Sequence, residues 1–402
     1  MRVEFSPPDI TDAECQEVEA ALQSGWITTG PRTKSLEKQV AERCDTTRAA
    51  CLNSATASLE LTLRVLGIGP GDEVIIPAYT YTASASPVVH VGATPVLVDA
   101  GQADGGYGLD PDVLAEALTP RTKAVIPVDI GGRMCDYTAL REVVDSQRHL
   151  FAPTGPIQEA LGRVALVADG AHSFGARRDG TSSGSAADFT TFSFHAVKNL
   201  TTAEGGAVTW RPDLGLDEEL YRQYMLLSLH GQSKDALAKT RLGAWEYDVV
   251  SPAYKCNMTD VCAAIGLAQM SRYDSMLARR RQIITRYDRV LAPAGMTSLR
   301  HYENGTISSG HLYLANLPDL GENGRNEFIE HMARADVACN VHYKPLPMLT
   351  AYRDLGFDIE DFPRAFDLYA NEVSLPLHTS LSDEQVDYVI DCALDALAAV
   401  GR

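Results

Sequence analysis

The sequence lacks any apolar run of about eighteen or more residues, which excludes a transmembrane helix. Its first eight residues, Met-Arg-Val-Glu-Phe-Ser-Pro-Pro, also lack the apolar centre of a signal peptide. Basic residues are scarce: 35 Lys and Arg stand against 53 Asp and Glu, a formal net charge of −18. That charge argues against non-specific binding to nucleic acid or to an anionic membrane. We therefore expect a cytoplasmic protein that binds neither.

The eight cysteines include no Cys-x-x-Cys pair, so neither a zinc ribbon nor a dithiol redox motif is expected. No other metal site is predicted. Scattered cysteines in a chain of this size are typical of buried thiols in a reducing compartment.

The first part of the chain alternates strand-like and helix-like segments. Several strand candidates are nearly continuous apolar runs, as expected for strands buried on both faces of a sheet. The alternation predicts a large α/β domain over residues 1–250 with a mainly parallel, seven-stranded sheet. The expected strands are Arg48–Ser54, Glu73–Tyr79, Thr94–Asp99, Lys123–Asp129, Val164–Asp169, Phe189–His195 and Gly206–Trp210, and the expected helices are Ala57–Leu66, Thr82–His90, Asp110–Leu118 and Tyr137–Ser146.

The pattern changes near Ser251, and residues 251–402 are expected to form a smaller C-terminal α+β domain. Asp260–Leu291 predicts one long helix, whose cluster Arg279–Arg281 is expected on a solvated face or a subunit contact. A Ser-x-x-Gln capping box predicts a closing helix from Ser382 to about Ala398. Strands are expected around Ile307–Leu317, Ala338–His342 and Val373–Leu375.

Two of the apolar strands end in an ionisable group. Lys198 follows the run Phe189–Phe194, and Asp169 ends the run Val164–Ala168. An amine and a carboxylate in these places suit pyridoxal 5'-phosphate, because that cofactor needs an amine to hold its aldehyde and a carboxylate to keep its ring nitrogen protonated. An isolated lysine is ordinarily a solvated surface group, and an aspartate after a strand can form an Asx turn. A lysine flanked by Phe194, Val197 and Leu200 is less ordinary.

Other polar and aromatic residues follow neighbouring strands, and ligands of open parallel sheets bind beyond the carboxyl ends of the strands. The run Asn53–Ala57 closes one strand and opens a helix, which suits a phosphate or an ordinary helix cap. Tyr79 and Tyr81 end the next strand, where one could stack on a pyridine ring or both could be core residues. His172 could contact the ring oxygen or be structural, and Ser193 could bind the phosphate.

The sequence resembles the DegT/DnrJ/EryC/StrS family of sugar-nucleotide aminotransferases, which have the type I fold of pyridoxal-phosphate enzymes. The similarity runs nearly from end to end, and its motifs are closest to those of enzymes that aminate C4 of a keto sugar, such as the 4-amino-4-deoxy-arabinose synthase. The matching segments are Gly25–Pro31, Ser54–Ala57, Gly69–Ile75, Gly92–Val96, Thr122–Ala124, Asp169–His172, Ser193–Asn199, Tyr254–Asp260 and Ser374–Leu377.

This resemblance implies a role for each residue of the site. Lys198 is the Schiff-base lysine, Asp169 pairs with the pyridine nitrogen, and His172 lies near the ring oxygen. Asn257 reaches the cofactor phosphate of a neighbouring subunit, which implies a homodimer with active sites at the interface. Tyr81 takes the stacking position, and the phosphate is bound by Ser54, Ala55, Thr56 and Ser193. Substrate contacts are expected from Trp26, Thr28, His195, His230, Trp245, His342 and Tyr343.

The implied reaction moves an amino group from L-glutamate, through pyridoxamine phosphate, to a nucleotide-linked keto sugar, with a 4-keto-6-deoxyhexose as the expected acceptor. Departures from the family pattern are Ala55, Gly170 and Cys256, and the last leaves a local substrate contact open. A 3-keto sugar or a cyclitol ketone is the alternative acceptor, and a non-catalytic regulatory member is the alternative class. A sugar dehydratase of this fold would carry histidine in place of Lys198. A nicotinamide dehydrogenase is disfavoured because Gly67–Gly71 follows a helix and precedes a strand.

Overall fold

The computed structural model describes residues 1–101, 105, 107–233, 246–303 and 305–401. Its centre is a seven-stranded sheet in the order β1-β9-β8-β5-β4-β2-β3, in which β9 runs antiparallel to both of its neighbours and the other paired strands are parallel. The mainly parallel sheet is thus confirmed. Its strands are β1 (Ala49–Leu52), β2 (Glu73–Pro77), β3 (Thr94–Val98), β4 (Thr122–Val125), β5 (Ala165–Asp169), β8 (Phe189–Ser193) and β9 (Gly206–Trp210).

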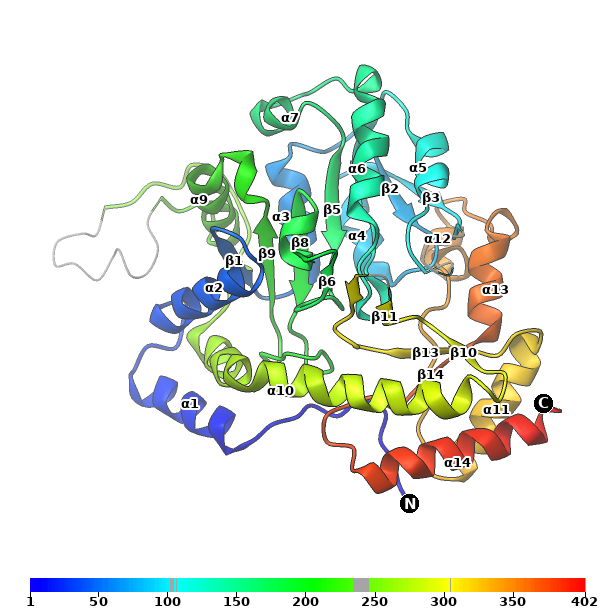
Figure 1. Ribbon diagram of the computed structural model, residues 1–402. Helices are drawn as coiled ribbons and strands as arrows, with labels where there is room; N and C mark the ends of the chain where they lie inside the picture. The colour runs from blue at the N-terminus through cyan, green and yellow to red at the C-terminus, as the bar shows by residue number, and fades with distance from the viewer. Residues whose placement is uncertain (102–104, 106, 234–245, 304, 402) are drawn as a thin grey trace.

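Both faces of this sheet are buried, which explains the continuous apolar runs of the sequence. Along β2, Val74 and Ile76 pack into one hydrophobic cluster, whereas Ile75 packs into another on the opposite face. Successive side chains of a strand point to opposite faces, so each face needs its own cover of helices. Figure 1 shows helices on both sides of the sheet, and those of the first part of the chain are α2 (Pro31–Arg43), α3 (Ala55–Val65), α4 (Thr82–His90), α5 (Pro111–Ala117), α6 (Tyr137–Ser146), α7 (Pro156–Leu161), α8 (Ser183–Ala186) and α9 (Asp217–Ser228). Helix α1 (Asp12–Gln23) lies below the sheet and packs against α10 (Asp260–Leu291).

The C-terminal part begins with the long helix α10 (Asp260–Leu291), which matches its expected bounds and crosses beneath the sheet beside α14 (Figure 1). The closing helix α14 (Asp383–Ala399) has the expected capping box of Ser382 and Gln385. A small sheet has the order β10-β13-β14, and short strands at 302–307 pair with a hairpin at 177–182. The remaining elements are α11 (Gly321–Arg334), α12 (Thr350–Arg353), α13 (Pro363–Asn371), β6 (Arg177–Arg178), β7 (Thr181–Ser182), β10 (Thr297–Ser298), β11 (Tyr302–Glu303), β12 (Thr306–Ile307), β13 (Tyr313–Asn316) and β14 (Glu372–Leu375).

The strand expected at Ala338–His342 is absent. Val337 pairs with Val3, and Asn340 pairs with Ser374 in an isolated bridge. The segment therefore passes from one partner to another and forms no continuous ladder. Val3 also packs into the C-terminal hydrophobic cluster, so the N-terminus joins the C-terminal part. The division of the chain at residue 250 stays a prediction.

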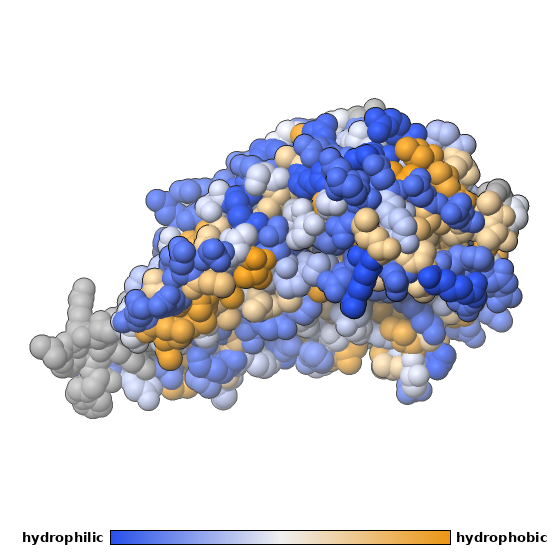
Figure 2. Space-filling view, turned by 90° about the horizontal axis from the view of Figure 1, so that it is seen from below, coloured by the Kyte–Doolittle hydropathy of each residue, from blue (hydrophilic) through white to orange (hydrophobic). Residues whose placement is uncertain are grey.

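The arginine cluster of α10 does not share a single solvated face. Arg280 is buried and donates hydrogen bonds to the carbonyls of Gly310 and Leu377, so the expectation of solvation is wrong for this residue. Arg279 pairs with Asp383, the first residue of α14, at 2.8 Å. Figure 2 views the molecule from below, the side on which α10 and α14 lie in Figure 1, and this face is mainly hydrophilic with separate apolar patches. No helix among the described residues is long and apolar enough to span a membrane.

A buried ion pair joins the residue before β8 to the segment before β5, and we expect it to contribute strongly to the stability of the fold. Asp188 is fully buried, binds both terminal nitrogens of Arg163 at 2.7 and 2.8 Å, and accepts the Leu166 amide. We expect Asp188→Ala to lower the free energy of unfolding by about 3–5 kcal/mol, because it leaves the buried guanidinium of Arg163 with only the partly exposed Asp145 as a counter-charge. Urea denaturation measures the loss. Glu330→Ala, which breaks an exposed pair with Arg334, should change stability by about 0–1 kcal/mol, and equal losses in the two variants would contradict the prediction.

Candidate active site

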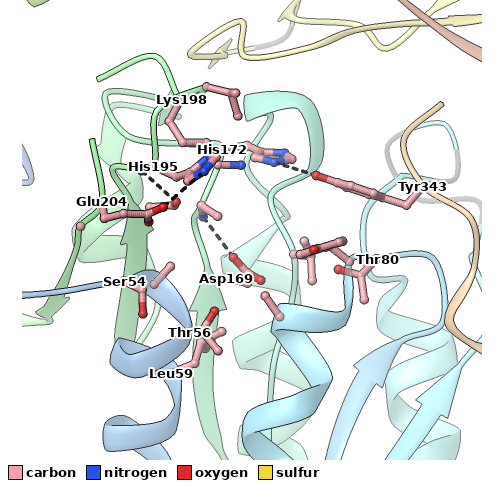
Figure 3. A pocket seen from close by; sticks show the side chains of 18 residues that line it. Ser54, Thr56, Leu59, Thr80, Asp169, His172, His195, Lys198, Glu204 and Tyr343 are labelled. Carbon is pink, nitrogen blue, oxygen red and sulfur yellow. Dashed lines mark hydrogen bonds and ion pairs between the residues drawn. The ribbon is translucent and has the colours of Figure 1, made fainter. Parts of the chain in front are cut away.

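A cavity of about 370 Å³ lies at the carboxyl ends of the parallel strands (Figure 3). The turn from β1 to α3, the segment after β2, the end of β5 and the turn after β8 all contribute to its wall. Tyr343 completes the wall from the C-terminal part of the chain. The lining includes Ser54, Ala55, Thr56, Thr80, Tyr81, Asp169, His172, Ser193, His195, Lys198, Glu204 and Tyr343.

One end of the cavity is built to receive an anion. Ser54 caps α3 by accepting the Ala57 amide, so the amides of Ala55 and Thr56 begin the helix without an intrahelical acceptor. Gly206 of β9 presses against this turn, since a Cβ there would lie 2.4 Å from the Ser54 carbonyl carbon. A helix N-terminus with exposed amides favours phosphate, even in a protein of net charge −18.

Asp169 ends β5 as a buried carboxylate, 6% exposed. It accepts hydrogen bonds from the Ser84 hydroxyl at 2.7 Å and from the Ala171 amide at 3.1 Å. Burial raises its pKa, although both hydrogen bonds and the charge of Lys198 oppose the rise. Among the described residues it forms no ion pair within 4.0 Å. A buried carboxylate whose hydrogen-bond partners are all neutral favours a cation beside it, and a protonated pyridine nitrogen would supply that cation.

Lys198 follows β8 and lines the same cavity. Burial lowers the pKa of its ammonium group to about 8, against the opposing influence of Asp169. A substantial share of the amine is therefore neutral near physiological pH, as a nucleophile or a proton acceptor requires. Anion site, carboxylate and amine together fit pyridoxal phosphate.

His172 and Tyr343 form a pair on the cavity wall. The Gly131 amide donates to His172 Nδ1 at 3.2 Å, so the neutral ring carries its proton on Nε2 and donates it to the Tyr343 hydroxyl oxygen at 3.1 Å. Burial, with the nearby charge of Lys198, lowers the pKa of His172 well below its usual value. His172 is thus a neutral hydrogen-bond donor.

Some of the remaining expected residues line the cavity, and others lie outside it. Ser193 and His195 line the cavity, and Tyr81 lies at its edge with its ring 5.6 Å from that of Tyr343. His342 precedes Tyr343 but does not itself line the cavity.

Besides His342, four expected residues are absent from the cavity of this chain: Trp26, Thr28, His230 and Asn257. Trp26 donates to the Thr29 carbonyl, and Asn257 Nδ2 donates to the Thr29 hydroxyl. Trp245 lies outside the described residues. The functional roles of all these residues stay predictions.

Sequence reasoning missed several residues of the site. Ser84, which binds Asp169, could have been found because it lies in the first turn of a helix that starts at this sheet edge. Gly131 and His311, whose ring lies 4.3 Å from that of His172, gave no local signal. Their positions depend on contacts with segments 41 and 139 residues away, respectively.

Comparison with known proteins identifies the family of this chain. The profile of the DegT/DnrJ/EryC1/StrS aminotransferase family matches residues 8–393. The spore coat polysaccharide biosynthesis protein SpsC of Bacillus subtilis is 38% identical over 398 residues, covering 97% of this chain and 96% of SpsC.

Two solved structures show the same fold over the whole chain. Spr1654 of Streptococcus pneumoniae, assigned as a sugar aminotransferase, superposes in its PMP form with a TM-score of 0.96 and 53% identity, covering 99% of this chain and 100% of that one. It has also been solved in a PLP form. Helicobacter pylori PseC, an aminotransferase of pseudaminic acid biosynthesis, has a TM-score of 0.86 and 26% identity, with 99% and 100% covered. The chain therefore belongs to the DegT/DnrJ/EryC1/StrS aminotransferase family and is a pyridoxal-phosphate-dependent enzyme of the type I aminotransferase fold.

Proposed function

We propose that this enzyme transfers an amino group from L-glutamate to C4 of a nucleotide-linked 4-keto-6-deoxyhexose, for natural-product or cell-surface glycan biosynthesis. The observation that carries the proposal is the convergence of Lys198 and Asp169 on one cavity that also holds a helix N-terminus. The names of SpsC and PseC, which refer to spore coat polysaccharide and to pseudaminic acid, support a sugar acceptor. A cytoplasmic location accords with the scattered free cysteines.

Each residue has a defined task in this proposal. Bound pyridoxal phosphate supplies an aldehyde for the donor amine and an electron-withdrawing ring. The neutral amine of Lys198 takes a proton from the α-carbon of the donor and later returns one to the former carbonyl carbon of the sugar. Asp169 holds the positive charge of the ring nitrogen, and His172 with Tyr343 forms a neutral polar wall. Tyr81 covers the ring, while Ser193 and the first amides of α3 bind the phosphate.

A homodimer would give a role to residues that lie away from the cavity of their own chain. Asn257, Trp26, Thr28 and His230 would then serve the site of the neighbouring subunit. Exposed apolar side chains close to His230 support such a contact, because its amide donates to the Tyr254 carbonyl and Tyr254 is 39% exposed. Tyr247, Val249 and Val250 extend this apolar surface.

The covalent role of Lys198 predicts one labelled position. Reduction of the cofactor-loaded protein with borohydride should fix the cofactor to the peptide that contains Lys198, with loss of the visible absorption band. Lys198→Ala should carry no fixed cofactor and lose at least about 10³-fold in kcat. Lys38→Ala, a change at an exposed lysine, should behave as the wild type. Peptide mass spectrometry is the measurement, and label on any other lysine would refute the assignment.

The electrostatic coupling between Asp169 and Lys198 predicts a pH dependence. In the cofactor-free protein, acetylation of Lys198 should be half-maximal near pH 8, because only the neutral amine reacts. Asp169→Asn should move this midpoint to lower pH, since the carboxylate favours the ammonium form. Quantitative mass spectrometry of the acetylated peptide reads both midpoints. The exposed substitution Asp213→Asn should leave the midpoint in place, and an upward move in Asp169→Asn would contradict the coupling.

The acceptor is tested by product mass. The loaded enzyme is incubated with L-glutamate and a panel of 4-keto and 3-keto sugar nucleotides and a cyclitol ketone. We expect an amino product from the 4-keto sugars, with kcat/KM at least about 10²-fold above that of the 3-keto sugars and the cyclitol ketone. A carbonyl at another ring position would lie away from the reacting amine and would lose the orientation that the reaction requires. Preference for a 3-keto sugar or cyclitol would replace the acceptor assignment. Absence of any amino product, with no exchange between glutamate and its keto acid, would favour a non-catalytic member.

A further inference from the structure

A polar cluster lies behind Tyr343, outside the cavity, where β14 meets the segment that carries His342. It consists of Glu372, Ser374 and His342, three residues to which the reaction described above assigns no task. Glu372 and Ser374 are fully buried, and both come from one short strand. Buried polar groups of this kind are costly unless each has a partner, so their arrangement is informative.

The three side chains form a continuous chain of hydrogen bonds. Ser374 Oγ lies 2.5 Å from Glu372 Oε1 and 2.8 Å from His342 Nδ1. The second carboxyl oxygen, Glu372 Oε2, accepts the backbone amide of His342 at 2.8 Å. Glu372 therefore holds His342 at two points, directly at the backbone and through Ser374 at the ring.

The surroundings of Glu372 favour its neutral form at physiological pH. Burial raises the pKa of Glu372 to about 8, although Ser374, the His342 amide and the charge of Arg325 all favour ionisation. Arg325 of α11 donates to the backbone carbonyl of Glu372 at 3.2 Å. The other titratable groups that face this carboxyl are Tyr79, Tyr107, Cys339 and Tyr343. Burial also lowers the pKa of His342 to about 4, so this imidazole is neutral.

The protonation state of Glu372 then dictates where the His342 ring carries its proton. A neutral Glu372 donates to Ser374, which donates to Nδ1, so the ring carries its proton on Nε2. An ionised Glu372 accepts from Ser374, which accepts from Nδ1–H, so Nε2 is bare. Ionisation of Glu372 therefore releases one proton to solvent, from Nε2 of His342. Two other protons move along the hydrogen bonds, one from Glu372 to Ser374 and one from Ser374 to Nδ1.

His342 is connected to the active site through its neighbour in sequence. Tyr343 contacts His172 Nε2 at 3.1 Å, and the Tyr79 hydroxyl donates to the carbonyl of His342. The His342 ring also stacks on Phe5, with 5.5 Å between centroids. His342 is therefore held at its amide, its carbonyl and its ring.

We propose that Glu372 and Ser374 are positioning residues that form a carboxyl–hydroxyl–imidazole relay, which sets the tautomer of His342 and, through the His342–Tyr343 segment, holds Tyr343 against His172. The relay joins β14 of the C-terminal part to the wall of the catalytic cavity. Neither Glu372 nor Ser374 lines that cavity, so both act through His342.

Nitrogen NMR of the cofactor-loaded enzyme, with ¹⁵N-labelled histidine, tests the relay without turnover. The His342 signals, identified by their loss in His342→Gln, should exchange the Nε2–H pattern for the Nδ1–H pattern with a midpoint near pH 8. Glu372→Gln should abolish this exchange and keep Nε2–H at every pH, because its amide donates to Ser374 permanently. Ser374→Ala should make the tautomer of His342 independent of the protonation state of Glu372. The matched control is Ser298→Ala, which removes a serine that donates to Asp288 in the same small sheet and should leave the exchange unchanged.

Kinetics supply the second readout. Ser374→Ala should lower kcat/KM by about 10- to 100-fold, because it misplaces Tyr343. Glu372→Gln should retain most activity below pH 8, and its pH–activity profile should lack any step that the wild type shows near pH 8. An exchange at pH 8 that persists in Glu372→Gln would overturn the proposal, as would an unchanged His342 tautomer and unchanged kcat/KM in folded Ser374→Ala. If Ser374→Ala does not fold, Glu372→Gln decides alone. Because the spectra need no sugar substrate, a wrong acceptor assignment leaves this test intact.

Discussion

The structure depends on a buried carboxylate that has no cation of its own. Asp169 ends a central strand, accepts two hydrogen bonds from neutral groups, and lies in the same cavity as a lysine whose pKa is lowered to about 8. A buried carboxylate and a buried amine that are not paired with each other are both destabilising for the apoprotein. In the proposed arrangement, pyridoxal phosphate would satisfy both at once, with its ring nitrogen paired with the first and its aldehyde bonded to the second. Binding of the cofactor in this arrangement would relieve the free-energy cost of the two buried groups.

The buried histidines at the cavity are neutral. His172 and His311 both have pKa values well below the usual range because burial penalises the imidazolium, and their rings lie 4.3 Å apart. The buried charged groups of the cavity are therefore the ammonium form of Lys198 and the carboxylate of Asp169, whereas the lining carboxylate of Glu204 is exposed. Because the chain has a net charge of −18, its overall field opposes an anionic ligand. Such a ligand must be held by local donors such as the amides of Ala55 and Thr56. The proposed relay of Glu372, Ser374 and His342 extends the same principle, since a neutral acid can position a ring without adding charge.

The local sequence determined much of this molecule. Every strand of the main sheet and the bounds of α4, α6 and α10 follow from apolar periodicity, because burial on both faces of a sheet or on one stripe of a helix imposes a regular pattern. Lys198 and Asp169 were visible because each follows such a run, and carboxyl ends of parallel strands share one edge of the sheet. The capping box of α14 was visible because its two residues are three apart.

Only the tertiary structure decided the contacts between segments far apart in the chain. Nothing in the local sequence indicates that Gly131 donates to His172, that Arg280 is buried against carbonyls of other segments, or that Tyr343 meets His172 across 171 residues. The segment Ala338–His342 was expected to form a strand, yet its backbone pairs with Ser374 only in an isolated bridge. Its last residue, His342, meets Glu372 through its backbone amide and Ser374 through its ring. Periodicity records which face of an element is buried. It does not record what the buried face touches, because that depends on how separate elements pack together.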